Sequence, residues 1–157
     1  MKILAIDPGT TQSAYILWNT EKQTVLSCGL MDNNPFVKKY ISFVQCKMAD
    51  LIAVEMIQNY GFQMGRSTIE TIMFVGELKA FWDANHYDVT EFKLYGRPTI
   101  KGHFNAKKDA MIRASLRMRY GEHEFKKGGK FYGVKKDIWS AMAIAVALTE
   151  NPNLKEW

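Results

Sequence analysis

Residue types that define whole classes of proteins are scarce in this sequence. The 157 residues include two cysteines, three histidines and four prolines. Isolated cysteines at 28 and 46 provide no disulfide framework, and the histidines lack the paired spacing of a zinc site. No apolar run approaches the roughly 18 residues that a transmembrane helix needs, and Asp7 and Pro8 interrupt any signal-peptide pattern. We therefore expect a cytoplasmic protein with reduced thiols and no membrane partner.

The composition otherwise fits one globular domain that covers residues 1–157. Hydrophobic residues make up 47% of the chain and charged residues 24%, which is ordinary for a globular protein. No internal repeat, low-complexity tract or linker divides the sequence. The length is sufficient for a single hydrophobic core.

Basic residues are concentrated in one part of the chain, although the net charge is only +5. Residues 93–136 contain thirteen Lys and Arg but three acids. A basic segment on an otherwise acidic body is typical of proteins that bind a polyanion, most often nucleic acid, and a solvated lysine-rich surface is the alternative. The glycine-rich segment 125–133 interleaves lysines with aromatics. This pattern suits a mobile loop that contacts phosphates and stacks on an unpaired base, but a plain surface loop would look similar.

Hydrophobic patterning predicts an α/β fold with a mixed five-stranded sheet and helices on both faces. Three strands separated by polar turns would form an antiparallel meander, and later strands would alternate with helices. Ser67 and Glu70 have the spacing of a capping box at the start of the second helix. The predicted strands are 2–7, 13–18, 24–31, 51–57 and 88–94, and the predicted helices are 35–48, 68–85, 105–120 and 137–150.

Three acids lie on elements that are otherwise apolar. Asp7 ends the first strand, Glu55 interrupts the fourth, and Asp137 opens the last helix. Asp7 could be a turn former and Asp137 a helix cap, but Glu is rarely buried without a partner. Carboxylates that converge from separate elements suit a hard divalent cation. Two Mg²⁺ ions about 4 Å apart would then support phosphodiester hydrolysis.

The residues around these acids resemble the RuvC family of Holliday-junction resolvases, and most of all its phage-borne members. The resemblance rests on Asp-Pro-Gly-Thr from Asp7, on Val-Glu at Glu55, and on an acid that opens a Ser-Ala-Met-Ala-Ile-Ala helix. It runs from residue 3 to about residue 148 and implies a ribonuclease H-like fold. It also implies a homodimer that cuts four-way DNA junctions with Mg²⁺, or with Mn²⁺ as an alternative.

The same resemblance assigns roles to individual residues. It implies that Asp7, Glu55 and Asp137 are the catalytic metal ligands. The family commonly has two acids three residues apart at the start of the last helix, whereas this chain has Asp137 and then Ser140, so Ser140 is expected as a weak ligand. Asp109 would be a fourth ligand only if its helix turned that face inward, which we do not expect.

A DNA-binding surface is expected along the basic helix, with Lys107 or Lys108 nearest the scissile phosphate. The segment after Glu55 falls where the family places a loop that probes the junction centre, and an aromatic there could wedge against a base. The expected DNA-binding residues are Tyr60, Phe62, Lys101, Lys107, Lys108, Arg113, Arg117, Lys126, Lys127, Lys130, Lys135 and Lys136.

The sequence thus predicts a metal-dependent, structure-selective endonuclease that cuts branched DNA and leaves 5′-phosphate ends. Two alternatives stay open. A ribosomal-RNA-processing nuclease of the same fold would share the opening motif but act on RNA. A non-catalytic module would bind branched DNA through the basic segment without using the acids.

Overall fold

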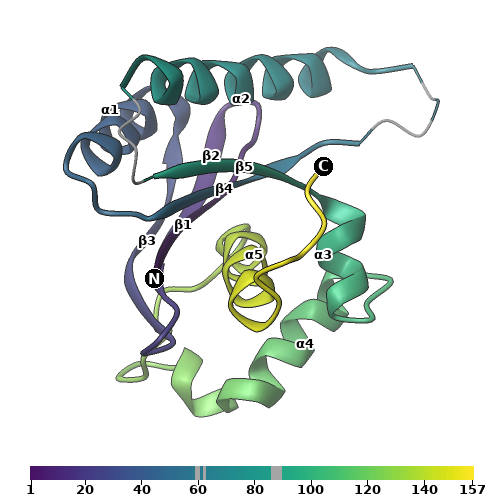
Figure 1. Ribbon diagram of the computed structural model, residues 1–157. Helices are drawn as coiled ribbons and strands as arrows, with labels where there is room; N and C mark the ends of the chain where they lie inside the picture. Colours follow the sequence, from purple (N-terminus) through teal and green to yellow (C-terminus); the bar gives the residue numbers. More distant parts are fainter. Residues whose placement is uncertain (59–60, 62, 86–89) are drawn as a thin grey trace.

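The protein has three layers, with a mixed sheet between two groups of helices (Figure 1). The computed structural model describes residues 1–58, 61, 63–85 and 90–157. α1 and α2 cover one face of the sheet, and α3, α4 and α5 lie on the other face (Figure 1). The elements in chain order are β1 (Lys2–Asp7), β2 (Gln12–Asn19), β3 (Thr24–Asp32), α1 (Asn33–Gln45), β4 (Leu51–Met56), α2 (Arg66–Asn85), β5 (Glu91–Gly96), α3 (Arg97–His103), α4 (Asp109–Tyr120), the short 3₁₀ helix η1 (Glu122–Phe125) and α5 (Ile138–Glu150).

The sheet has the strand order β3-β2-β1-β4-β5. β1, β2 and β3 pair antiparallel, whereas β4 pairs parallel with both β1 and β5. Apolar residues fill both faces of β1, β2 and β4, which explains why these strands read as short, continuous apolar runs. The predicted ribonuclease H-like fold, a meander followed by parallel strands, is confirmed.

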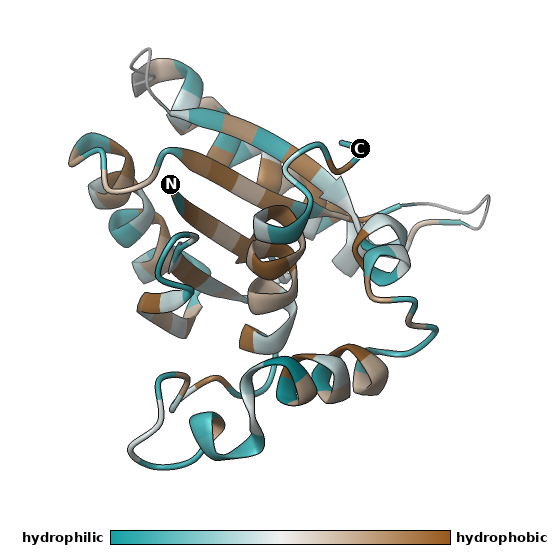
Figure 2. Cartoon of the chain, turned by 60° about the horizontal axis from the view of Figure 1, so that its bottom comes forward, coloured by the Kyte–Doolittle hydropathy of each residue, from teal (hydrophilic) through white to brown (hydrophobic). Residues whose placement is uncertain are grey.

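α5 forms the centre of the larger core. Its residues 138, 139 and 141–148 are all buried, and the apolar helix lies between the sheet and the surrounding helices (Figure 2). Four alanines between Ala141 and Ala147 keep the side chains of this helix small, which suits its close packing in the core. At its last turn, Trp18 on β2 donates its indole N–H to Thr149 Oγ1 at 3.0 Å. α5 is therefore packed against β1 and β2, and its C-terminal end is tied to β2.

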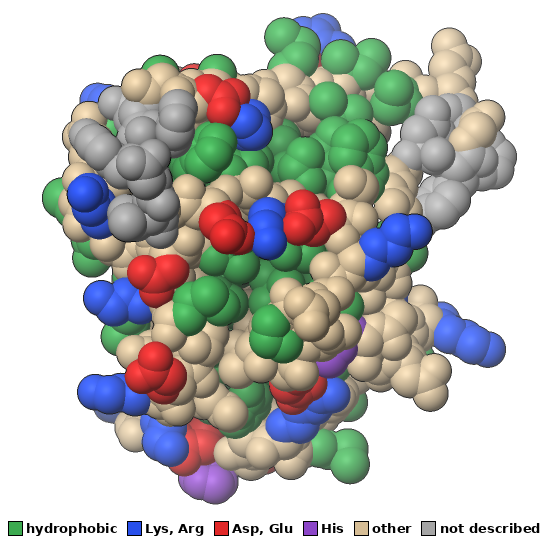
Figure 3. Space-filling view, viewed as in Figure 1, with side chains coloured by type: hydrophobic (Ala, Val, Ile, Leu, Met, Phe, Trp, Pro, Cys, Tyr) green, Lys and Arg blue, Asp and Glu red, His purple; other side chains and the backbone are tan. Residues whose placement is uncertain are grey.

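The surface mixes charged and apolar side chains. Acidic and basic groups are interspersed on the face shown in Figure 3. Met73 on α2 is 69% exposed and Met118 on α4 is 87% exposed. In the described part of the chain, no helix combines the length and apolar character needed to cross a membrane.

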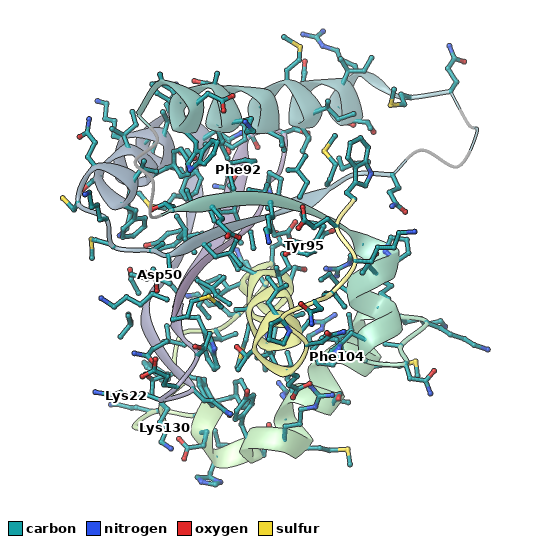
Figure 4. All side chains as sticks on the ribbon, viewed as in Figure 1. Lys22, Asp50, Phe92, Tyr95, Phe104 and Lys130 are labelled. Atoms are coloured by element: carbon teal, nitrogen blue, oxygen red, sulfur yellow. The ribbon has the colours of Figure 1, made fainter. Side chains whose placement is uncertain are left out.

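The second core lies between the sheet and the pair α1 and α2. Phe36 and Tyr40 from α1 are fully buried there, and the Tyr40 hydroxyl donates to the Leu78 carbonyl oxygen of α2 at 2.9 Å. β5 separates the two cores, because Phe92 packs on the α2 side while Tyr95 packs on the α5 side (Figure 4).

Two expectations about helix starts are wrong. α2 begins at Arg66, so Ser67 lies inside the helix and cannot cap it. Its carbonyl accepts a hydrogen bond from the Thr71 hydroxyl at 2.9 Å, and Glu70 pairs with Arg66 at 2.6 Å instead of closing a capping box. α1 begins at Asn33, two residues before the predicted start at residue 35.

The basic helix expected over 105–120 is also different. Within this range the chain forms α4, which begins at Asp109, and α3 lies before the range. The chain between α3 and α4 turns at Asn105, whose φ is +49°. The left-handed conformation, which asparagine tolerates well, ends α3 and lets α4 begin at Asp109. This break places Arg97 and Asp109 at the first turns of successive helices.

The glycine-rich segment is anchored, contrary to the expectation of a mobile loop that stacks on DNA. Phe131 is 1% exposed, and its ring centroid lies 4.9 Å from Tyr120, 5.1 Å from Phe125 and 5.9 Å from Trp18. Its backbone N–H donates to the Glu124 carbonyl at 2.9 Å. The aromatic residues that suggested base stacking are therefore largely committed to the core.

Candidate active site

Asp7 and Glu55 end neighbouring parallel strands and share one face of the sheet. The register pairs Ile6 with Val54, so Asp7 and Glu55 follow one step later on β1 and β4. Because side chains alternate along a strand, both carboxylates lie on the face that packs against α5. The parallel pairing thus brings together two acids that are 48 residues apart in the sequence.

The turn after Asp7 is held by Ser13 and Asn33, which sequence reasoning missed. Ser13 is fully buried, and its Oγ donates to Asn33 Oδ1 at 2.8 Å. Asn33 Nδ2 in turn donates to the carbonyl oxygens of Gly9 at 3.0 Å and Thr10 at 3.1 Å. Gly9 is required here because a Cβ would lie 2.4 Å from the Gln12 carbonyl oxygen. The sequence signal for this role was Ser13, a polar residue inside an otherwise apolar strand.

Asp137 and Ser140 approach the same site from α5. Asp137 takes the N-cap position of this helix, but its side chain makes no capping hydrogen bond. The interpretation of Asp137 as a simple helix cap therefore loses its main support. The Ser140 hydroxyl favours the charged form of Asp7 and lowers its pKa, whereas the negative charge of Asp137 raises the pKa of Asp7.

Burial raises the pKa values of the two acids near the strand ends. Desolvation raises the pKa of Asp7 to about 6, although Ser140 and Arg97 oppose the shift. Desolvation and the charge of Asp7 raise the pKa of Glu55 to about 7. Such shifts mean that the ionised forms of these two buried acids are poorly solvated.

Arg97 is the main cation of the site and was not among the predicted residues. Its Nη1 lies 2.8 Å from Glu55 Oε2, and its Nη2 lies 2.9 Å from Asp109 Oδ1. Lys101 Nζ is 3.1 Å from the same Asp109 oxygen. Burial opposes the charge of Arg97, but the two carboxylates outweigh this and raise its pKa. Asp109 therefore joins the cluster through Arg97 and Lys101.

A cavity of about 130 Å³ opens beside these residues. Its walls combine acids and bases from α3, α4 and the start of α5. Burial raises the pKa of Asp109, but hydrogen bonds and charges from Lys101 and Arg97 bring it below the ordinary value. The lining residues are Arg97, Asp109, Ile112, Arg113, Lys136, Asp137, Trp139 and Ser140.

The donors suit a hard divalent cation, although they are not preassembled around one. Asp7, Glu55 and Asp137 supply carboxylate oxygens, and Ser140 supplies a hydroxyl. The raised pKa values of Asp7 and Glu55 show that added positive charge would be stabilising there. Within the described ranges, however, no three His, Cys, Asp or Glu side chains are grouped closely enough to hold an ion.

Most of the predicted DNA-binding cations are exposed, but some are engaged in ion pairs. Lys101 pairs with Asp109, and Arg117 lies 3.4 Å from Glu122 and over the Trp139 ring. Tyr60 and Phe62 lie outside the described residues. In the part of the chain that the structure describes, the predicted cations with no ion pair are Lys107, Lys108, Arg113, Lys126, Lys127, Lys130, Lys135 and Lys136.

Solved structures with the same fold include Holliday-junction resolvases. RuvC from Thermus thermophilus superposes with a TM-score of 0.73 over the whole of both chains, at 13% sequence identity. T. thermophilus RuvC in complex with a Holliday junction substrate gives 0.65 at 16% identity, covering 100% of this chain and 99% of that one. The yeast mitochondrial Holliday junction resolvase gives 0.63 at 14% identity, covering 94% of this chain and 77% of the resolvase.

These similarities show the fold, and sequence comparison adds no closer relative. No protein-family model and no curated protein matches the chain. The chain therefore has the ribonuclease H-like fold of RuvC. Any function has to be argued from its own residues.

Proposed function

We propose that the protein is a metal-dependent endonuclease that cuts branched DNA, with the four-way junction as its main substrate. The observation that carries the proposal is that Asp7 feels the charge of Asp137 and acts on Glu55, and that the pKa values of Asp7 and Glu55 are raised. A cavity beside them is bordered by the exposed cations Arg113 and Lys136. The fold is shared with a RuvC structure in complex with a Holliday junction substrate.

In this proposal Asp7, Glu55 and Asp137 hold the divalent cation, Mg²⁺ or Mn²⁺. The bound ion would supply Lewis acidity at the scissile phosphate. Attack of water on the phosphorus would break the P–O3′ bond and leave a 5′-phosphate and a 3′-hydroxyl. Ser140 orients the Asp7 carboxylate, and Arg97 fixes Glu55. The Asn33 side chain keeps the turn after Asp7 in place.

The unpaired cations would bind the phosphate backbone. Lys107 and Lys108 precede α4 and are exposed, and Lys135 and Lys136 precede Asp137. Such contacts supply affinity through counterion release, so junction binding should weaken steeply with salt. The exposed lysines 126, 127 and 130 extend the basic surface along the glycine-rich segment.

Two paired cuts in one junction require two active sites, and we therefore include a homodimer in the proposal. The exposed apolar side chains of Ile69 and Met73 on α2, 45% and 69% exposed, offer one candidate interface. A phage-type enzyme that acts in the host cytoplasm is the setting that the sequence resemblance favours.

The test is cleavage of a labelled four-way DNA junction beside a linear duplex and a structured RNA. Each substrate is incubated with Mg²⁺, Mn²⁺ or EDTA and with wild type, Glu55→Gln or Glu77→Gln, the last being a matched change of an exposed acid on α2. We expect paired nicks in the junction that need the metal and are lost only in Glu55→Gln, while junction binding survives.

Other outcomes would replace the proposal. Tight junction binding without cuts under either metal would identify a binding module. Cleavage confined to RNA would identify an RNA-processing nuclease. Cleavage that is unchanged in Glu55→Gln would show that the carboxylates are not the active site.

A further inference from the structure

Arg97 lies directly against the carboxylate of Glu55. The side chains of Arg97 and Glu55 are 20% and 14% exposed, so both charges are largely removed from water. The guanidinium donates to Glu55 Oε2 at 2.8 Å. Only the other oxygen of Glu55 is left free of Arg97 to bind an ion, and two ions about 4 Å apart normally need shared carboxylates.

Arg97 is also anchored in this position. It begins α3 directly after β5, and Tyr95 of that strand pairs with Glu55 of β4. Its second nitrogen is bound to Asp109 Oδ1 at 2.9 Å, and the same oxygen accepts from Lys101. A buried arginine tied to two carboxylates from different elements leaves its place only if both pairs break, which is costly.

The charges around the site favour the same conclusion. Four carboxylates act on one another here, those of Asp7, Glu55, Asp109 and Asp137. Arg97 and Lys101 are the two cations in direct contact with them in the described residues. When all four acids are ionised, they carry two more charges than Arg97 and Lys101, and Arg113 and Lys136 add positive charge in the wall of the same cavity. This balance leaves little negative charge for more than one divalent ion. The family's usual second acid on the last helix is replaced by Ser140, which removes a further anionic ligand.

We propose that Arg97 is a built-in cation that takes the place of a second metal ion beside Glu55, so that each chain binds a single divalent ion. This inference rests on the proposed metal site and replaces the two ions expected from the sequence. Arg97 is a positioning residue in this scheme, because it acts through Glu55.

The test counts Mn²⁺ ions bound to the full-length protein at pH 8, by titration calorimetry and by the electron paramagnetic resonance signal of free Mn²⁺. Arg97→Ala and Arg97→Gln remove the charge, Arg97→Lys retains it, and Arg113→Ala removes a cation from the same cavity that has no pair with Glu55. Thermal unfolding shows which variants are folded.

We expect one ion per chain in wild type, Arg97→Lys and Arg113→Ala, and two in Arg97→Ala and Arg97→Gln. Two ions in wild type would overturn the role of Arg97 but leave the proposed nuclease intact. One ion per chain in folded Arg97→Ala and Arg97→Gln would also overturn the role of Arg97. No saturable Mn²⁺ binding in any variant would contradict the metal site itself, and with it this inference.

Discussion

The carboxylates of Asp7 and Glu55 lie on the same face of adjacent parallel strands, where burial raises their pKa values to about 6 and about 7. In an unfolded chain both acids would titrate near their ordinary values, around pH 4. The native protein therefore takes up protons that the unfolded chain releases, so the pair makes the metal-free protein less stable as the pH rises.

The first prediction follows from the sign of this shift. Replacing Asp7 by Asn should leave stability nearly unchanged at about pH 3, where the acid is mostly protonated in both states. The variant should become more stable than wild type as the pH rises from about 3 to about 7, by up to roughly 3 kcal/mol. Urea unfolding in EDTA measures the difference. A gap that does not change with pH would contradict the assigned pKa of Asp7.

The second prediction concerns the glycine-rich segment. Phe131→Ala removes a ring that packs on Tyr120 and Phe125 in the larger core, and it should cost about 3–5 kcal/mol of unfolding free energy. Tyr132→Ala, at a neighbouring side chain that is 63% exposed, should cost less than about 0.5 kcal/mol. Equal effects in chemical denaturation would mean that Phe131 is not anchored in the core.

The third prediction tests the basic surface. Changing Lys107 and Lys108 together to Ala should weaken junction binding and reduce the slope of log K against log salt by about 2, because about one phosphate contact is lost per lysine. Lys38→Ala, an exposed lysine on α1, should change neither value. Fluorescence anisotropy at several salt concentrations provides both. An effect from Lys38 as large as that of the pair would place the DNA elsewhere.

The fourth prediction concerns the turn that follows Asp7. In Gly9→Ala the new Cβ would lie 2.4 Å from the Gln12 carbonyl, so the turn must shift, at a cost of roughly 1–3 kcal/mol, and junction cleavage should fall. Gly102→Ala in α3 meets no atom within 4 Å and should be neutral or slightly stabilising. Thermal unfolding and cleavage assays compare the two. Normal cleavage by a folded Gly9→Ala would show that the turn does not position Asp7.

The strands of the sheet could be predicted well because the pattern that defines each strand lies within a few neighbouring residues. The strands are short apolar runs bounded by polar turns, and their predicted bounds lie close to β1, β2, β3 and β4. The same runs place Asp7 and Glu55 near strand ends, and the parallel pairing of β1 with β4 brings the two acids side by side. Acids that interrupt apolar runs are visible without any structure.

The parts that could not be predicted depend on contacts between distant residues. Arg97 looks like one more cation in a basic segment, and its pair with Glu55 spans 42 residues. Asp109 joins them because the chain turns at Asn105 and α4 begins only at Asp109, whereas the helix was expected to begin at residue 105 and α3 was not predicted. The interleaved lysines and aromatics around Phe131 fit a mobile loop and an anchored one equally well. In each case tertiary packing decided the outcome.

The burial of α5 also determines how the carboxylate site can come apart. A helix whose residues 141–148 are all buried cannot open by fraying or by a local fluctuation. Its amide hydrogens should exchange with solvent only when the whole domain unfolds. Asp137 and Ser140 are thus attached to the most slowly exchanging part of the molecule, so the carboxylate cluster persists for as long as the protein is folded.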